Sequence, residues 1–257
     1  MSKIISIIGG KGGTGKTTST INLGAALNSL GKSSIVIDGN LTTPNVGIYL
    51  GIPVVPVNLH HVLAKKNHIS EAMYLHPSGM QIIPGDISTE QLKNVDPLKL
   101  NKAMLDLEGL ADYILIDAAA GLGREALAAI KASDKVLIIT NPEMPAVTDA
   151  LKTIQIVQDM KKQVLGVVLT RSRDDEWDMG VNEVEKMLEY PILGVIPEDE
   201  NVRKAMVLKN PIMFSYPNSN ASVGYKKLAS KISGIKYKEE VKKEEGFWDK
   251  LRSVFGI

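Results

Sequence analysis

The chain has 257 residues, of which 44% are hydrophobic and 23% are charged, so it resembles a folded globular protein with one large domain or two small ones. It contains no cysteine, which excludes disulfide bonds, thiolate metal sites and cysteine nucleophiles. Thirty Lys and Arg residues against 29 Asp and Glu leave a net charge of +1, which argues against a surface dedicated to nucleic acid.

Short runs rich in β-branched residues alternate with longer stretches of helical periodicity. The runs are mostly apolar throughout, as in strands that are covered on both faces. The predicted strands are 4–8, 34–38, 81–84, 113–117, 135–140, 164–170 and 192–196, and the predicted helices are 16–30, 58–65, 98–105, 123–131, 145–160, 181–188 and 220–232. This alternation predicts an α/β fold in three layers, with a mostly parallel twisted sheet between two layers of helices.

The composition changes near the C-terminus. Residues 236–245, KYKEEVKKEE, are almost all charged, and a glycine follows them. We therefore divide the chain into a domain at 1–235, a charged linker at 236–245 and a terminal segment at 246–257. No apolar run reaches the roughly 18 residues of a transmembrane helix, and the N-terminus lacks the pattern of a secretory signal, so we expect a cytoplasmic protein.

The first predicted strand is followed by a glycine-rich phosphate-binding motif, GxxxxGK[ST]. The pattern lies between a strand and a helix, which is the context that such a loop requires. We expect Lys16 to contact the β- and γ-phosphates of a nucleotide and the Thr17 hydroxyl to bind Mg²⁺. The predicted ATP-binding residues of this loop are Gly10, Lys11, Gly12, Gly13, Thr14, Gly15, Lys16, Thr17 and Thr18.

The second lysine of the loop makes the pattern more specific. With Lys11 the loop reads KGGTGKT and resembles the deviant Walker A ATPases of the MinD/ParA family. The resemblance extends from residue 4 to about residue 232 and implies the P-loop NTPase fold. It also implies an ATP-dependent homodimer in which Lys11 reaches the nucleotide bound by the partner. A cation there would offset the repulsion between two facing triphosphates.

The predicted strand 34–38 ends at Asp38, where the family has the pattern Asp-x-Asp. The resemblance places Asp38 near Mg²⁺ and its waters, but the second acid is replaced here by Asn40. An asparagine can hold a water molecule through its amide oxygen, yet it cannot take up a proton. We predict slow hydrolysis of ATP, with Lys11, Lys16, Asp38 and Asn40 as the catalytic residues.

A second carboxylate and a base pocket complete the predicted site. Asp117 ends the apolar strand 113–117, as in a Walker B motif, and joins Thr17 and Asp38 as the predicted metal site. The resemblance assigns the base to Arg171, Pro197 and Glu198, although these residues could instead have a structural role. Thr170 stands where the family usually has asparagine, so the selectivity for the base is open.

The terminal segment has the layout of an interfacial amphipathic helix. Two of the three Phe residues and one of the two Trp residues of the chain lie in it, and its apolar side chains share one face of a helical wheel. A helix that packs on the protein's own core is the alternative. The predicted membrane-binding residues are Phe247, Trp248, Lys250, Leu251, Arg252, Val254 and Phe255.

These features favour the MinD branch of the family. The expected protein binds ATP and Mg²⁺, forms a homodimer, attaches reversibly to the anionic inner face of the cell membrane and positions cell-division or other machinery. Its other expected partner is an unidentified regulatory or cargo protein. A ParA-like DNA-partitioning ATPase and a slow or non-hydrolysing nucleotide-gated scaffold remain alternatives. The near-neutral net charge counts against DNA.

Overall fold

The computed structural model describes residues 1–88 and 95–237. The predicted terminal segment at 246–257, with its membrane-binding residues, lies outside the described residues, as does the linker from residue 238 onward. Within the described residues, no helix combines the length and the apolar character that crossing a bilayer requires.

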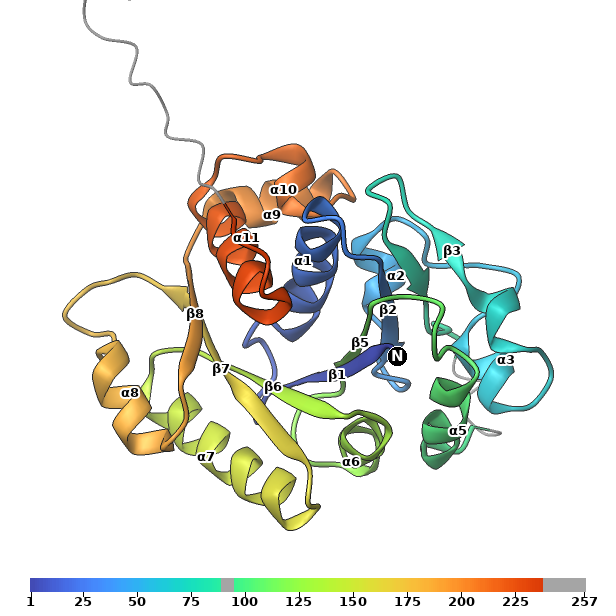
Figure 1. The fold of residues 1–257 in the computed structure, drawn as a ribbon, viewed down its shortest axis with the longest axis horizontal. Coiled ribbons are helices and arrows are strands. Elements are labelled where there is room, and N and C mark those ends of the chain that lie inside the picture. Colours follow the sequence, from blue (N-terminus) through green and yellow to red (C-terminus); the bar gives the residue numbers. More distant parts are fainter. Residues whose placement is uncertain (89–94, 238–257) are drawn as a thin grey trace, which may run out of the picture.

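Eight strands form one sheet in the order β3-β4-β2-β5-β1-β6-β7-β8 (Figure 1). Neighbouring strands run parallel, except that β3 pairs antiparallel with β4 at one edge. The strands are β1 (Lys3–Ile8), β2 (Ser34–Gly39), β3 (Tyr74–Leu75), β4 (Gln81–Ile83), β5 (Tyr113–Ala118), β6 (Lys135–Thr140), β7 (Gln163–Ser172) and β8 (Ile192–Pro197).

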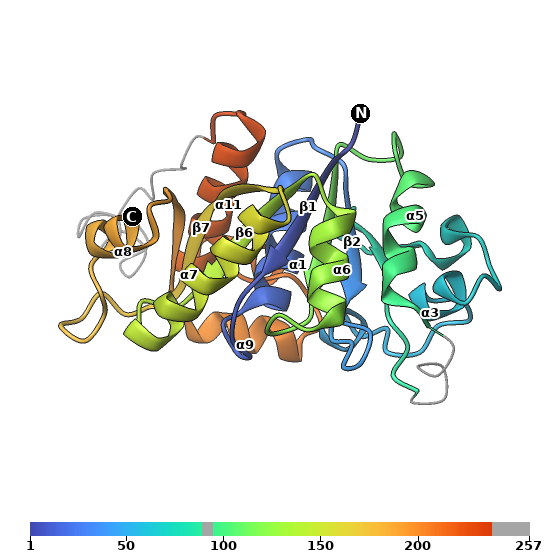
Figure 2. The ribbon, with the colours of Figure 1, turned by 90° about the horizontal axis from the view of Figure 1, so that it is seen from below.

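Helices cover both faces of this sheet, as Figures 1 and 2 show. The helices of one face are α1 (Lys16–Ser29), α2 (Val46–Tyr49), α9 (Glu200–Val207), α10 (Ile212–Ser215) and α11 (Asn220–Ser233). The helices of the other face are α3 (Leu59–Leu63), α5 (Leu100–Leu105), α6 (Arg124–Ala132), α7 (Met144–Asp159) and α8 (Val181–Leu188), with the short 3₁₀ helices η1 (Ile69–Ala72) and η2 (Pro97–Lys99).

Alternate residues of the central strands build two separate cores. In β2, Val36 faces the core under α1 and α11, whereas Ile35 and Ile37 face the core under α3, α5 and α6. All three side chains are fully buried. Because both faces are covered, these strands are apolar throughout, which is the pattern that predicted them.

The predicted three-layer α/β fold is confirmed, and the seven predicted strands all form within two residues of the expected bounds. The sequence patterns missed β3, α2, α9 and α10. The strand β3 has two residues, and α9, with the sequence ENVRKAMV, buries only Ala205 among its eight. Elements of two to four residues are too short for a periodic apolar signal, whereas α9 has one turn of helical apolar spacing, at Val202, Ala205 and Met206, that the patterns above did not include.

The parallel arrangement brings the chemistry-bearing residues to one edge of the sheet. The strands β1, β2 and β5 are neighbours, and their C-terminal ends meet there. The register places Asp38 of β2 beside Asp117 of β5, and Asp117 is also level with Ile7 of β1. The loop that follows β1 therefore starts next to both carboxylates, at the edge where open α/β sheets bind ligands.

Candidate functional site

The glycine-rich loop joins β1 to α1. Gly13 and Gly15 have φ angles of 80° and 85°, a left-handed conformation that favours glycine. Gly15 is also the N-cap of α1, and no side chain caps that helix end. The backbone N–H groups at the start of α1 are therefore free of a capping side chain, and they form an anion-binding end of the kind that cradles phosphate.

Lys16 and Thr17 link this loop to the carboxylates. The Thr17 hydroxyl donates a hydrogen bond of 2.6 Å to Oδ2 of Asp117. The Lys16 Nζ donates one of 2.8 Å to the backbone carbonyl of Lys11. Burial lowers the pKa of the Lys16 ammonium, and the charge of Asp117 opposes this shift. A phosphate group bound in the loop would replace the carbonyl oxygen of Lys11 as the acceptor for the Lys16 ammonium.

The carboxylates of Asp38 and Asp117 are buried together, with exposed fractions of 0% and 1%. Oδ2 of Asp38 accepts a hydrogen bond of 2.8 Å from the backbone N–H of Val46, but its Oδ1 is buried with no hydrogen-bond partner among the residues that the structure describes. Burial and the charge of Asp117 raise the pKa of Asp38 well above its usual value. Burial also raises the pKa of Asp117 to about 6.

This pair with the Thr17 hydroxyl fits a divalent cation. An unpartnered buried carboxylate oxygen is costly by itself, and hard oxygen ligands are those that Mg²⁺ prefers. Thr17, Asp38 and Asp117 would hold the ion, directly or through water. Within the described residues no cluster of three or more His, Cys, Asp or Glu could hold a metal alone, so nucleotide phosphates and water would complete the coordination.

Asn40 is committed to the turn that follows β2. Its Nδ2 donates a hydrogen bond of 2.6 Å to the carbonyl of Thr43, and its Oδ1 accepts one of 3.1 Å from the Thr43 hydroxyl. Nδ2 of Asn45 also donates to the Thr43 carbonyl, at 2.7 Å. The amide oxygen that could hold the attacking water therefore already accepts from Thr43, and a water would share this oxygen with the Thr43 hydroxyl.

The predicted base pocket lies at the ends of β7 and β8. Nε of Arg171 donates to Oε2 of Glu198 at 3.2 Å, and its NH1 group donates to the carbonyl of Gly13 at 3.4 Å. The Thr170 hydroxyl lies 2.7 Å from the carbonyl of Thr14 and 3.0 Å from Oδ1 of Asn141. It has one hydrogen to donate, so Thr170 binds the glycine-rich loop to β7 and contributes no free donor for a base.

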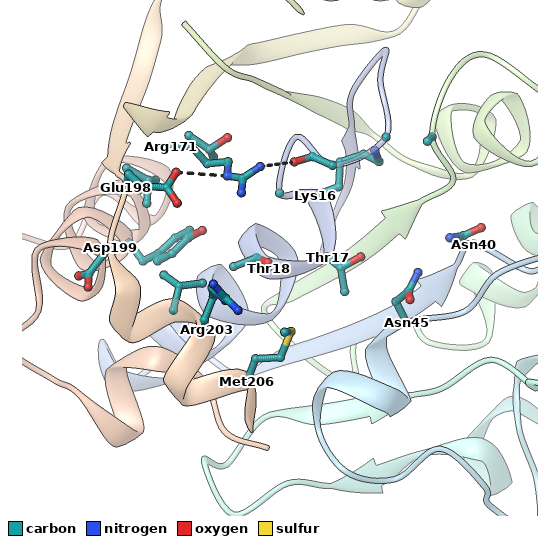
Figure 3. A pocket seen from close by; sticks show the side chains of 18 of the residues that line it. Lys16, Thr17, Thr18, Asn40, Asn45, Arg171, Glu198, Asp199, Arg203 and Met206 are labelled. Atoms are coloured by element: carbon teal, nitrogen blue, oxygen red, sulfur yellow. Dashed lines mark hydrogen bonds and ion pairs between the residues drawn. The ribbon is translucent and has the colours of Figure 1, made fainter. Parts of the chain in front are cut away.

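One cavity of about 560 Å³ joins these parts (Figure 3). The predicted residues that line it are Gly12, Gly13, Gly15, Lys16, Thr17, Thr18, Asn40, Arg171, Pro197 and Glu198. The predicted residues that do not line it are Gly10, Lys11, Thr14, Asp38 and Asp117, and Asp117 is hydrogen-bonded to Thr17, which does line it. The lining residues that the sequence did not predict are Thr43, Asn45, Ala118, Ala120, Thr170, Ile196, Asp199, Val202, Arg203, Met206 and Tyr225.

Three of these missed residues come from α9, which begins directly after the predicted turn at Pro197 and Glu198. Val202, Arg203 and Met206 share one face of this helix, at the spacing that lines one surface. Tyr225 of α11 closes the wall, and its hydroxyl lies 3.2 Å from Oγ of Ser19. The only sequence signal for this wall was its position just beyond the turn at 197–199.

The fold and the site define a P-loop nucleotide-binding protein. The model of the CobQ/CobB/MinD/ParA nucleotide binding domain matches residues 5–212, and the chain belongs to this family. Family and site together support a P-loop ATPase of the MinD/ParA type with ATP and Mg²⁺ as cofactors. The resemblance found in the glycine-rich loop is thereby confirmed, whereas the roles of the individual site residues stay predictions.

Relatives match over nearly the whole chain. A protein of Methanocaldococcus jannaschii described as an uncharacterized ATP-binding protein is 37% identical over 258 residues, covering 100% of this chain and 98% of its own. The septum site-determining protein MinD of Bacillus subtilis is 30% identical over 275 residues, covering 100% of this chain and 99% of its own.

Solved structures agree with these relatives. The septum site-determining protein MinD of Pyrococcus horikoshii, complexed with Mg-ADP, superposes with a TM-score of 0.88 at 36% identity, covering 93% of this chain and 100% of that chain. MinD in the MinC:MinD cell division protein complex of Aquifex aeolicus gives a TM-score of 0.82 at 28% identity, covering 92% and 98%.

Proposed function

We propose that this chain is an ATP-dependent dimerising ATPase that binds an anionic membrane reversibly through residues 246–257 and positions cell-division or other cellular machinery. The observation that carries the proposal is the cavity lined by Lys16 and Thr17, with Thr17 hydrogen-bonded to Asp117 and the buried Asp38 beside Asp117 in the sheet. Relatives that are named for septum-site determination and cell division support it. The division at 236 and 246 into domain, linker and membrane segment is part of this proposal.

Hydrolysis by this chain is slow because of Asn40. In-line attack on a phosphate needs a positioned water molecule. The oxygen of Asn40 that would orient this water accepts a hydrogen bond from Thr43, and an amide cannot take up the proton. Asn40 therefore supplies no base, and its amide oxygen holds a water only while it also accepts from Thr43. ATP stays bound for long periods before it is cleaved.

Single-turnover hydrolysis by wild type and Asn40→Asp tests this point. A positioned general base contributes about 10²- to 10⁴-fold, so we expect the substitution to raise the rate at least tenfold. Asn45→Asp is the matched control, because Asn45 donates to the same Thr43 carbonyl and its change adds the same charge. A rate that stays unchanged in Asn40→Asp refutes the role of Asn40. Retention of ATP by the wild type with no turnover favours the nucleotide-gated scaffold.

The dimer depends on Lys11, whose side chain is exposed and does not line the cavity of its own chain. A cation in that position is free to reach a second copy that faces the nucleotide. Lys11→Ala should therefore abolish the ATP-dependent dimer while leaving ADP binding by the monomer unchanged. Light scattering after size-exclusion chromatography in ATP and in ADP measures this. A variant that still dimerises with ATP contradicts the assignment.

In this proposal, membrane binding requires two terminal segments, each of which binds the membrane weakly by itself, held together by the dimer. Each terminal helix would bury a few apolar side chains, worth about 1.5–3 kcal/mol each at most, against the cost of ordering the segment. Pairing them raises the effective concentration of the second segment and strengthens binding strongly. ATP, but not ADP, should therefore drive attachment.

Co-sedimentation with anionic vesicles tests this switch. We expect full-length protein with ATP to sediment, and expect little sedimentation with ADP or with a chain that ends at Glu245. Neutral phosphatidylcholine vesicles are the control for the role of the cations. Equal sedimentation in the four combinations of chain and nucleotide removes the membrane proposal and leaves the nucleotide site untouched.

A further inference from the structure

Three cationic side chains line the cavity, namely those of Lys16, Arg171 and Arg203. Lys16 donates to the backbone carbonyl of Lys11, and Arg171 is paired with Glu198. Arg203 differs from both, because no hydrogen bond or ion pair within residues 1–88 and 95–237 engages its guanidinium. Among the described residues that line the cavity, Arg203 is therefore the cation without a partner from residues 1–88 and 95–237.

The position of Arg203 relates it to a particular part of a bound nucleotide. The cavity extends from Lys16 and Thr17, which are expected to hold the β- and γ-phosphates, to Pro197 and Glu198, which are expected beside the base. Figure 3 shows Arg203 and Met206 rising from α9 on the side of Thr18, away from the pair formed by Arg171 and Glu198. Arg203 thus lines the part of the cavity beside Thr18, the residue that follows Thr17 in the glycine-rich loop.

We propose that Arg203 binds the α-phosphate, the phosphate group that AMP, ADP and ATP share. A guanidinium presents planar N–H donors that match phosphate oxygens, and it keeps its charge at every physiological pH. Val202 and Met206, on the same face of α9, give this part of the cavity apolar side chains beside the Arg203 guanidinium. The inference rests on the proposed use of the cavity as the nucleotide site. It does not depend on hydrolysis, dimerisation or membrane binding.

The adjacent residue provides a control within the same helix. Lys204 does not line the cavity, and its Nζ is paired with Oε1 of Glu200 at 2.6 Å. Both cations are exposed. Removal of either side chain changes the net charge by the same amount in the same turn of α9. Only removal of Arg203 should affect a ligand in the cavity.

Calorimetry with Mg²⁺ measures the binding of ADP and of ATP, the latter under conditions in which ATP is not hydrolysed. Competition with fluorescent ADP measures the binding of AMP. We expect Arg203→Ala to weaken the binding of all three nucleotides by a similar factor, about tenfold or more, which corresponds to one charge-assisted contact. Arg203→Lys should lose less, and Lys204→Ala should stay within about twofold of wild type.

Several results would overturn the inference. A loss of affinity for ATP alone would place Arg203 at the γ-phosphate. A loss of affinity for ADP and ATP, but not for AMP, would place it at the β-phosphate. Equal losses in Arg203→Ala and Lys204→Ala would show a general effect of charge, and no loss would exclude contact. If wild-type protein binds no nucleotide, the proposed function fails first. Melting temperatures without nucleotide confirm that each variant is folded.

Discussion

Asp38→Asn should make the nucleotide-free protein more stable while removing its response to Mg²⁺. Asp38 is 0% exposed, and its Oδ1 has no hydrogen-bond partner. Burial and the neighbouring charge of Asp117 raise its pKa well above the usual value, so folding costs free energy whether the carboxyl keeps its charge or takes up a proton. In the variant, the amide oxygen can still accept from Val46, and the new N–H group can donate to Asp117.

The size of the gain follows from the unpartnered group. A buried polar atom without a partner costs about 1–3 kcal/mol, and a charged one costs more. We therefore expect the variant to gain about 2 kcal/mol in EDTA at pH 7.5. For a chain of this size this raises the melting temperature by roughly 4–8 °C. A raised folded-state pKa destabilises as the pH rises above the unfolded value of 3.8, so the gain should shrink as the pH falls toward 4.

Thermal and urea unfolding of wild type and variant, each with EDTA, ADP or Mg-ADP, measure both effects. Saturating Mg-ADP should stabilise the wild type beyond ADP alone, by mass action, and this increment should vanish in the variant. Asp134→Asn is the control, because its exposed carboxylate accepts one backbone hydrogen bond from Ile4 and should gain nothing. If Asp38→Asn is less stable than wild type in EDTA, the claim that the buried Asp38 carboxylate destabilises the nucleotide-free protein is refuted. A retained Mg²⁺ increment would refute the metal site.

Two further outcomes concern the loop after β2. Burial lowers the pKa of His60, whose Nδ1 accepts from the N–H of Asp86 at 2.9 Å and whose Nε2 lies 3.0 Å from the carbonyl of Leu41. The contribution of His60 to stability is therefore present above pH 6.5 and is lost as the pH falls through the lowered pKa. We expect the unfolding free energies of wild type and His60→Gln to converge between pH 7.5 and pH 5. A difference that stays constant over this range would exclude this titration. The carboxylate of Glu125 accepts hydrogen bonds from the backbone N–H of Thr42, at 3.2 Å, and from the Thr42 hydroxyl. Glu125→Ala should therefore speed amide hydrogen exchange at residues 41–43, while the global free energy of unfolding falls by no more than about 1 kcal/mol. Unchanged exchange would show that other contacts hold the loop.

The sequence alone determined the elements whose signal is local. The glycine-rich loop between strand and helix, the aspartates at the ends of two apolar strands and the seven long or buried strands were all predicted, and the parallel sheet follows from their alternation with helices. These features depend on neighbouring residues and on a repeated pattern of burial. The chain belongs to the family that Lys11 and the loop indicated.

Only the tertiary structure decided how the side chains of this site are used. The Thr170 hydroxyl contacts the carbonyl of Thr14, which lies 156 positions earlier, and the amide of Asn40, which lines the cavity, is hydrogen-bonded to Thr43. The helix α9 is short and mostly exposed, yet it provides a wall of the cavity and the guanidinium of Arg203. No local pattern encodes such contacts, because they arise when separate elements pack on the same edge of one sheet.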